Sequence, residues 1–218
     1  DDRVLRLLKA TTTAYLGYLN RMQGRYQEAV RYYQQASRGY RLLDMGALIS
    51  TLGNQAYAMA RVGRLRRARQ IVREADRRAD EEVMPYWQAH ALNIWGIVES
   101  LDGHSRTALH HTDRALEILK RAEHERESSN KIERLKSLIY LTRGRTYRYQ
   151  WNDYVRDQRW LEGWDNTIVR AYRALEGYEG ALKRLKRLGA NDPPESYFIE
   201  VLVESGCTFR EMAWMFRH

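Results

Sequence analysis

Apolar residues recur along most of this chain at spacings of three and four, which is the period of an amphipathic helix. Val4, Leu5, Leu7 and Leu8 already begin such a stripe. Periodicity and capping residues together predict ten helices, at residues 3–23, 25–43, 47–62, 64–80, 85–102, 104–126, 130–150, 166–188, 194–205 and 208–217. The pattern therefore predicts an all-α protein.

Small residues return inside these helices with a fixed period. Three triplets share one internal spacing and recur with a period of about 40 residues: Gly24, Ala29 and Ala36; Gly63, Ala68 and Ala75; Gly103, Ala108 and Ala115. Helix axes approach closely only where side chains are small, so a recurring set of small residues predicts recurring helix contacts. Such a period in helical segments is typical of stacked helix pairs that share one continuous core.

The first unit resembles the tetratricopeptide repeat (TPR) consensus. The residues that carry the resemblance are Leu16, Gly17, Gly24, Tyr26, Ala29, Tyr33 and Ala36. The second unit keeps Ala56 at the small position of its first helix, and the third keeps Gly96. The resemblance covers about residues 10–182 and implies a right-handed superhelix of stacked antiparallel helix pairs, an α-solenoid.

The resemblance also implies one repeat domain over residues 1–218, with units at about 10–43, 49–82, 89–122 and 132–188 and a terminal helix pair at 194–217. The fourth unit is interrupted, because the interval between Gly144 and Ala174 is far longer than the matching interval in a regular repeat. The inserted stretch, about residues 151–166, contains four large aromatic residues: Trp151, Tyr154, Trp160 and Trp164. These aromatic residues predict either a satellite core at the end of the superhelix or an aromatic binding surface.

In TPR proteins the ligand lies against the first helices of the units, on the concave face. Register places these residues there: Tyr18, Arg21, Met22, Tyr57, Arg61, His90, Asn93, Ile97, Arg145, Arg148 and Tyr149. Such a wall is basic and aromatic, so we expect an anionic ligand, whether protein, peptide or small molecule. The lysines and asparagines of the chaperone-binding carboxylate clamp are absent from most matching positions, so a chaperone C-terminus is not the expected ligand.

Arginine dominates the charge of the chain. Lys and Arg number 37 against 28 Asp and Glu, which gives a net charge of +9. A dense run lies between Arg61 and Arg78, where Arg66, Arg69, Arg73 and Arg77 share one helix face. This face predicts either a surface that tracks a nucleic-acid backbone or a solvated outer face partly paired with nearby carboxylates. Because Arg favours bidentate carboxylate pairing, an acidic protein partner explains the bias equally well.

Candidates for chemistry are weak. His104, His110 and His111 cluster in the sequence, but no Cys or carboxylate joins them at metal-ligand spacing. We find no nucleophile, acid pair or phosphate loop, and so expect a non-enzymatic chain without metal or cofactor. A single Cys207, no signal peptide and no bilayer-length apolar run indicate a reducing, cytoplasmic location away from membranes.

The C-terminal end permits two interpretations. Gly206 predicts a break, and Thr208 with Glu211 predicts a capping box that starts the last helix. Two short helices here resemble the first two of a helix-turn-helix DNA-binding domain, although the recognition helix is missing. Alternatively, they form a terminal pair that covers the open end of the core.

Arg-rich repeats of this length, followed by degenerate units, look like the C-terminal sensor arrays of bacterial signal-transducing ATPases with numerous domains (STAND). That group includes maltose-regulator-like activators and NLR-like defence ATPases. The resemblance implies a ligand sensor whose ATPase domain lies upstream of Asp1 in the same protein. The chain opens on Asp1 and Asp2 rather than Met and enters a helical pattern at once, so we expect a piece of a longer protein.

Overall fold

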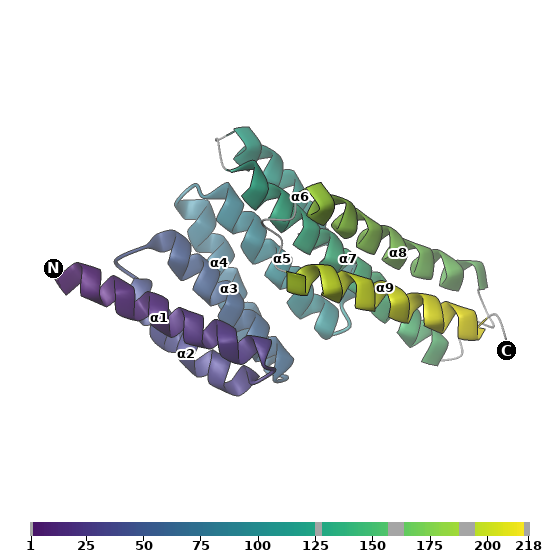
Figure 1. Cartoon of the computed structure of the whole chain (residues 1–218), viewed down its shortest axis with the longest axis horizontal. Helices are drawn as coiled ribbons and strands as arrows, with labels where there is room; N and C mark the ends of the chain where they lie inside the picture. The colour runs from purple at the N-terminus through teal and green to yellow at the C-terminus, as the bar shows by residue number, and fades with distance from the viewer. Residues whose placement is uncertain (1, 125–127, 157–163, 188–194, 216–218) are drawn as a thin grey trace. The chain divides into compact units, whose positions relative to one another are not determined.

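The computed structural model describes the backbone of residues 2–124, 128–156, 164–187 and 195–215, and most side chains within these ranges. All regular structure in the described residues is helical (Figure 1). The helices are α1 (Asp2–Met22), α2 (Tyr26–Tyr40), α3 (Met45–Arg61), α4 (Leu65–Glu81), α5 (Pro85–Leu101), α6 (Ser105–His124), α7 (Ser129–Arg156), α8 (Trp164–Arg187) and α9 (Glu195–Met215). The predicted all-α class is confirmed.

The helices group into two compact units. Unit 1 comprises Asp1–Asp102 and contains α1 to α5. Unit 2 comprises Gly103–His218 and contains α6 to α9. Within each unit the helices pack mainly against their neighbours in the chain, as expected of a helical repeat.

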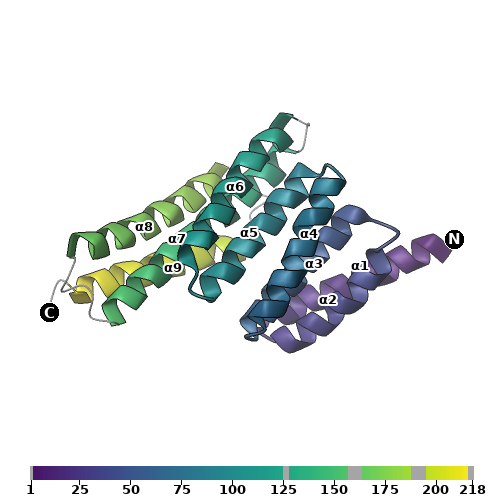
Figure 2. The same cartoon turned by 180° about the vertical axis from the view of Figure 1, so that it is seen from behind.

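Unit 1 is a row of antiparallel helices in which α2 packs between α1 and α3, and α4 between α3 and α5 (Figure 2). Small residues make these contacts close, and four of the predicted alanines are fully buried: Ala29, Ala36, Ala68 and Ala75. A Cβ atom on Gly17 of α1 would lie 2.8 Å from the ring of Tyr33 in α2. The small residues therefore lie where the repeat pattern predicts helix contacts.

The recurring glycines close the helix turns. Gly24 and Gly63 adopt positive φ angles of 73° and 79°, in the left-handed region that other residues rarely occupy. After each of them the next amide reaches back into the preceding helix, with Arg25 N donating to Asn20 O at 2.9 Å and Arg64 N donating to Met59 O at 2.9 Å. Gly103, at the start of unit 2, repeats the conformation with a φ of 79°.

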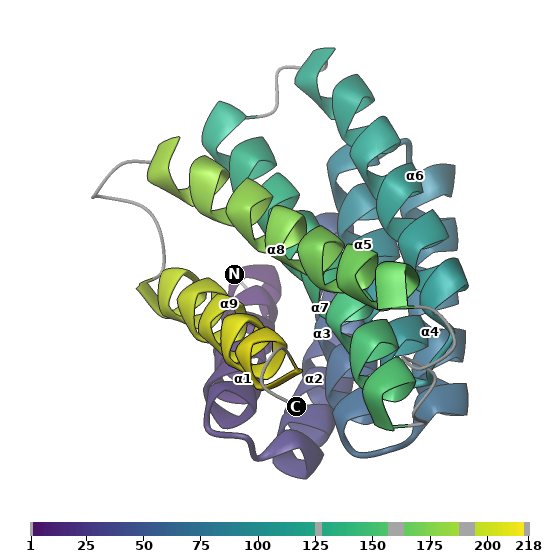
Figure 3. The same ribbon diagram turned by 90° about the vertical axis from the view of Figure 1, so that its right-hand side faces the viewer.

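Unit 2 is built around the crossing of α7 and α8 (Figure 3). A Cβ atom on Gly177 would lie 2.7 Å from the backbone nitrogen of Gly144, so the two backbones touch. A Cβ atom on Gly144 would lie 2.6 Å from the ring of Tyr178, which repeats the contact of Gly17 with Tyr33 in unit 1. Helix α9 packs on α8 and also contacts α7.

One predicted helix end in unit 2 is wrong. The helix predicted at 130–150 continues to Arg156, so it includes Trp151, whose side chain is buried. The regular α-helical hydrogen bonding continues there because the apolar spacing does not break at residue 150. Trp160 and the side chains of Tyr154 and Trp164 lie outside the described residues.

The predicted terminal helix pair is also wrong, because residues 195–215 form one helix. Gly206 lies inside α9, and the hydroxyl of the buried Thr208 donates to Glu204 O at 3.0 Å instead of capping a helix start. A glycine inside a helix costs only about 1 kcal/mol, which packing against α8 offsets. The helix-turn-helix interpretation required the missing turn and therefore loses its basis.

Candidate ligand-binding wall

Arg21 stands between two tyrosine rings in unit 1. Its guanidinium carbon lies 5.2 Å from the centre of the Tyr18 ring, on the same helix, and 5.3 Å from that of Tyr57 on α3. Both distances are within the range of cation–π attraction. The positive charge of Arg21 is therefore held by two of the helices that the TPR register assigns to the concave face.

The stacking continues toward the end of α3. Tyr26 meets Tyr57 edge to face, with ring centres 6.2 Å apart, and the guanidinium carbon of Arg61 lies 5.2 Å from the Tyr26 ring. We call the surface formed by Tyr18, Arg21, Tyr57 and Arg61 the unit 1 wall. Its arginines alternate with tyrosines, and an aromatic ring orientates each guanidinium group.

His90 of α5 lies close beside this wall. Its ring packs on Gly53, where a Cβ atom would be 3.1 Å from Cε1, and its centre lies 6.0 Å from the Trp87 ring. Burial and the nearby positive charge of Arg21 lower the pKa of His90 to about 4. The imidazole is therefore neutral at pH 7, and its Nδ1 has no hydrogen-bond partner among the described residues.

The remaining predicted residues of unit 1 contribute differently. Met22 is exposed at the end of α1, Ile97 packs against the core, and the Asn93 side chain is buried. Tyr18, Arg21, Tyr57 and Arg61 are thus the predicted residues that the structure brings together as a surface.

In unit 2, the predicted wall arginines contact α9. Arg148 Nη2 lies 2.7 Å from Glu211 Oε1, and Arg148 also pairs with Glu204. Arg145 Nε lies 3.3 Å from Glu204 Oε1. The carboxylates, Glu211 first, raise the pKa of Arg148 above its usual value. Tyr149 is half-buried on the same helix.

The pairing of Arg148 with Glu204 and Glu211, which we call the carboxylate clamp of α9, has a simple helical geometry. Glu204 and Glu211 are seven residues apart, about two helical turns, and so lie on one side of α9. Their pairing with the arginines was not predicted from the sequence. The seven-residue spacing of acids on an apolar helix was the available signal, but it does not reveal which basic helix lies opposite.

The dense arginine run of α4 is largely engaged inside unit 1. Arg69 makes a bidentate contact with Glu99 at 2.8 and 2.9 Å and also pairs with Asp102. The same Glu99 accepts a hydrogen bond from Trp95 Nε1 at 3.0 Å, and Arg73 stacks over the Trp95 ring at 5.6 Å.

Farther along α4, Arg77 pairs with Glu74 at 2.9 Å and with Glu81 at 2.5 Å. Arg78 also pairs with Glu74 at 2.5 Å, whereas Arg66 and Arg67 are exposed. Half of the face proposed to track phosphates, Arg69 and Arg77, is thus paired with carboxylates of the chain itself.

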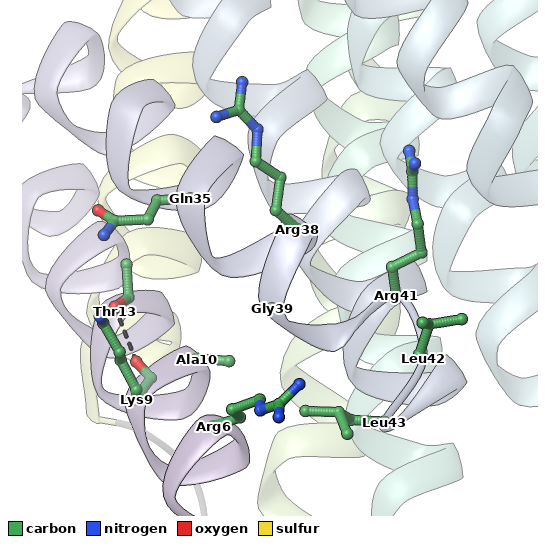
Figure 4. A pocket seen from close by; sticks show the side chains of 10 residues that line it. All are labelled: Arg6, Lys9, Ala10, Thr13, Gln35, Arg38, Gly39, Arg41, Leu42 and Leu43. Atoms are coloured by element: carbon green, nitrogen blue, oxygen red, sulfur yellow. Dashed lines mark hydrogen bonds between the residues drawn. The ribbon is translucent and has the colours of Figure 1, made fainter. Parts of the chain in front are cut away.

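A basic cleft of about 410 Å³ lies between α1 and the end of α2 (Figure 4). Its lining comprises Arg6, Lys9, Ala10, Thr13, Gln35, Arg38, Gly39, Arg41, Leu42 and Leu43. Arg6 points toward Leu43 and pairs with Asp2. The lining includes four cations and no acid, so the cleft is chemically suited to an anionic group beside a small apolar surface.

No cluster of three or more His, Cys, Asp or Glu side chains suited to a metal ion occurs in the described residues. Over the same residues, no helix combines the length and the apolar character needed to cross a bilayer. Comparison with known proteins finds no family profile that matches this chain and no curated relative.

Proposed function

We propose that this chain is a non-enzymatic recognition module of the TPR type, which binds an acidic segment of a protein partner on the unit 1 wall. In this proposal the helix pairs form a right-handed superhelix, and the first helices α1, α3 and α5 line its concave face. Unit 1 favours such an arrangement, because α3 contacts both α1 and α5.

The observation that carries the proposal is the clamp on α9. Arg148 lies four residues after Gly144, and Arg21 lies four residues after Gly17, so the two arginines occupy equivalent positions in their helices. Arg148 holds two glutamates of a helix. An acidic helix is therefore the kind of ligand for which this repeat position already has the chemistry, since guanidinium groups pair with carboxylates in two-point contacts.

The tyrosines of the unit 1 wall suit the same ligand. Their rings orientate Arg21 and Arg61 and offer apolar surface to the side chains between two acids. A small anion would use the charges but not the rings. We therefore favour a peptide segment of a protein over an isolated phosphate.

We further propose that the module serves as the sensor of a larger cytoplasmic signalling protein of the STAND type. The support is the resemblance of the Arg-rich repeats, and an ATPase domain of the same protein would be the partner that responds. Ligand binding would act on that domain by favouring one of its conformations, which requires different affinities for the two.

The test uses a labelled alanine-based helical peptide with two glutamates seven residues apart, the spacing of Glu204 and Glu211. We expect Tyr57→Ala combined with Arg61→Ala to weaken binding about tenfold, because a ring and a charged donor are lost. Fluorescence anisotropy measures the affinity, and circular dichroism checks that helicity is unchanged.

Two controls make this test specific. A peptide with glutamines in place of the glutamates should bind weakly to the parent chain. Arg66→Glu combined with Arg73→Glu removes more positive charge but leaves the unit 1 wall intact, so it should retain most of the affinity. Loss of binding in this second variant, with binding kept in the wall variant, would refute the proposed wall and favour the outer face of α4.

A further inference from the structure

The basic cleft between α1 and the end of α2 lies within unit 1 and shares no residue with the unit 1 wall. Its floor is the close contact of the two helices, where a Cβ atom on Gly39 would lie 2.7 Å from the Cβ atom of Ala10. The volume of about 410 Å³ is of the size that small-molecule sites have. Four cations lie around this floor (Figure 4): Arg6, Lys9, Arg38 and Arg41.

The second repeat shows how the chain neutralises one of these positions elsewhere. The spacing of the recurring glycines relates Arg38 of α2 to Arg77 of α4. Arg77 pairs with Glu74 at 2.9 Å and with Glu81 at 2.5 Å, one helical turn to either side of it. In the second repeat this arginine is therefore paired with acids of its own helix.

The first repeat replaces those acids. Gln35 and Leu42 occupy the positions of the two glutamates that pair with the arginine of α4. A further acid of α4, Asp80, corresponds to Arg41. Among the described residues, no carboxylate lies within ion-pair distance of Arg38 or Arg41. The same repeat positions thus change from internal ion pairs in α4 to unneutralised cations at the end of α2.

The acids nearest in the sequence are used elsewhere. Asp44 accepts a hydrogen bond from Ala47 N at 2.8 Å and so caps the start of α3. Asp2 pairs with Arg6, but both side chains are exposed, and such a pair is weak. The lining of the cleft contains no acid. The cleft therefore keeps positive charge that the described part of the chain does not neutralise.

The first repeat also provides space and an apolar surface. Ala10 and Gly39 correspond to Ile49 and Arg78 in the second repeat, where both side chains are far larger. Leu42, at the rim of the cleft, is 90% exposed. Room, positive charge and an apolar rim thus occur together at repeat positions that carry larger side chains and acids in the second repeat.

We propose that this cleft binds a small organic phosphate, a phosphate monoester whose organic part is apolar. A phosphate monoester carries nearly two negative charges and three acceptor oxygens, so it matches several cations, whereas a carboxylate carries one charge. Arginine forks bind phosphate oxygens in two-point contacts, and the organic part lies on Leu42. This site is additional to the peptide site proposed for the unit 1 wall and does not depend on it.

Titration calorimetry with naphthyl phosphate tests the proposal. The parent chain should bind it more tightly than inorganic phosphate, because the ring adds an apolar contact. Naphthol, which lacks the phosphate, should give no measurable binding. Gln35→Glu with Leu42→Glu gives Arg38 the two acids that its counterpart in α4 has. This variant should weaken the binding of both phosphates at least tenfold, although it removes no cation.

Two control variants separate charge from apolar contact. Gln27→Glu with Gln70→Glu adds the same two charges at exposed positions outside the cleft, and should bind both phosphates like the parent. Leu42→Gln removes the apolar rim without adding charge. It should bring the affinity for naphthyl phosphate down to that for inorganic phosphate, and leave the latter unchanged. Circular dichroism checks that the helicity of each variant is that of the parent.

Three results would overturn the proposal. The first is a parent chain that binds naphthyl phosphate no more tightly than inorganic phosphate. The second is undiminished binding in the variant with Gln35→Glu and Leu42→Glu. The third is a loss of phosphate binding in the wall variant, Tyr57→Ala with Arg61→Ala, because it would place the phosphate on the unit 1 wall instead of in the cleft.

Discussion

The two compact units use an arginine at the same repeat position for different contacts. Arg21 of unit 1 stacks between tyrosine rings, and Arg148 of unit 2 holds two glutamates of α9. Aromatic stacking fixes the direction of a cation without supplying an opposite charge, whereas carboxylates neutralise the charge as well. The comparison shows that the same repeat position contacts aromatic rings in one unit and pairs with carboxylates of α9 in the other.

The closest helix contacts of the two units also differ in the kind of atom that a glycine faces. In unit 1 the atoms nearest to a Cβ on Gly17 belong to a side chain, the buried ring of Tyr33. In unit 2 the atoms nearest to a Cβ on Gly177 belong to the backbone of Gly144 and Tyr140, which can shift only together with their helix. The crossing of α7 and α8 is therefore the less tolerant of the two.

Gly177→Ala should produce the largest effect and sharpen this difference. The new methyl group would meet backbone atoms, so we predict a loss of roughly 2–3 kcal/mol in the free energy of unfolding. Gly17→Ala should cost less, because a side-chain ring can adjust through its torsion angles whereas backbone can move only with its helix. Gly206→Ala, with nothing within 4 Å, should stabilise α9 by about 0.5–1 kcal/mol. Urea unfolding measures all three; equal losses for Gly17 and Gly177 would contradict the comparison.

Acid should weaken unit 1 through His90. The folded pKa is about 4, below the ordinary 6.5, so between these values the unfolded chain binds a proton that the folded chain does not. Stability therefore falls as the pH drops through 6.5, by roughly 2 kcal/mol between pH 7 and pH 5, and this contribution levels off below pH 4.

The matched variant is His90→Gln, which removes the titrating group. Urea unfolding of both proteins at pH 7 and pH 5 separates this contribution from that of other groups. A variant with the same loss between the two pH values as the parent would show that His90 is not responsible.

Breaking the pairing of Arg148 with Glu204 and Glu211 should cause a smaller loss of stability than Gly177→Ala or the acid titration of His90. Glu204→Gln with Glu211→Gln leaves Arg148 partly buried without its carboxylates, and we predict a loss of about 1 kcal/mol, since the pair is partly screened by solvent. Exposed Glu117→Gln on α6 is the control.

The double variant Glu204→Gln with Glu211→Gln should also give the probe peptide with two glutamates a second binding site, which titration calorimetry detects as a changed stoichiometry. An unchanged stoichiometry would show that Arg148 does not bind the peptide when its carboxylates are removed.

Local chemistry explains which parts of the fold could be predicted. Gly24, Gly63 and Gly103 mark the turns because each adopts a positive φ angle that strongly favours glycine. The five helices of unit 1 begin and end within a few residues of their predicted positions, because the turns at Gly24 and Gly63 and the proline Pro85 mark several of their ends. Gly206 does not end a helix, since a glycine is also tolerated inside a helix when packing supports it.

The candidate site was predictable only in part. Register brought Tyr18, Arg21, Tyr57 and Arg61 to one surface, because first helices repeat at a fixed spacing. The pairing of Arg148 with Glu211 joins residues 63 positions apart, and no local pattern encodes such a contact. Whether an arginine at this repeat position pairs with a carboxylate thus depends on which helix packs beside it.

The order of helix packing also has a kinetic consequence. Because nearly every strong contact in unit 1 joins helices adjacent in the chain, little loop entropy must be lost before a contact forms. Folding can begin at any helix pair and spread to its neighbours. The amides of α1, at the edge of this row, should then exchange with solvent before those of α3, which is held on both sides.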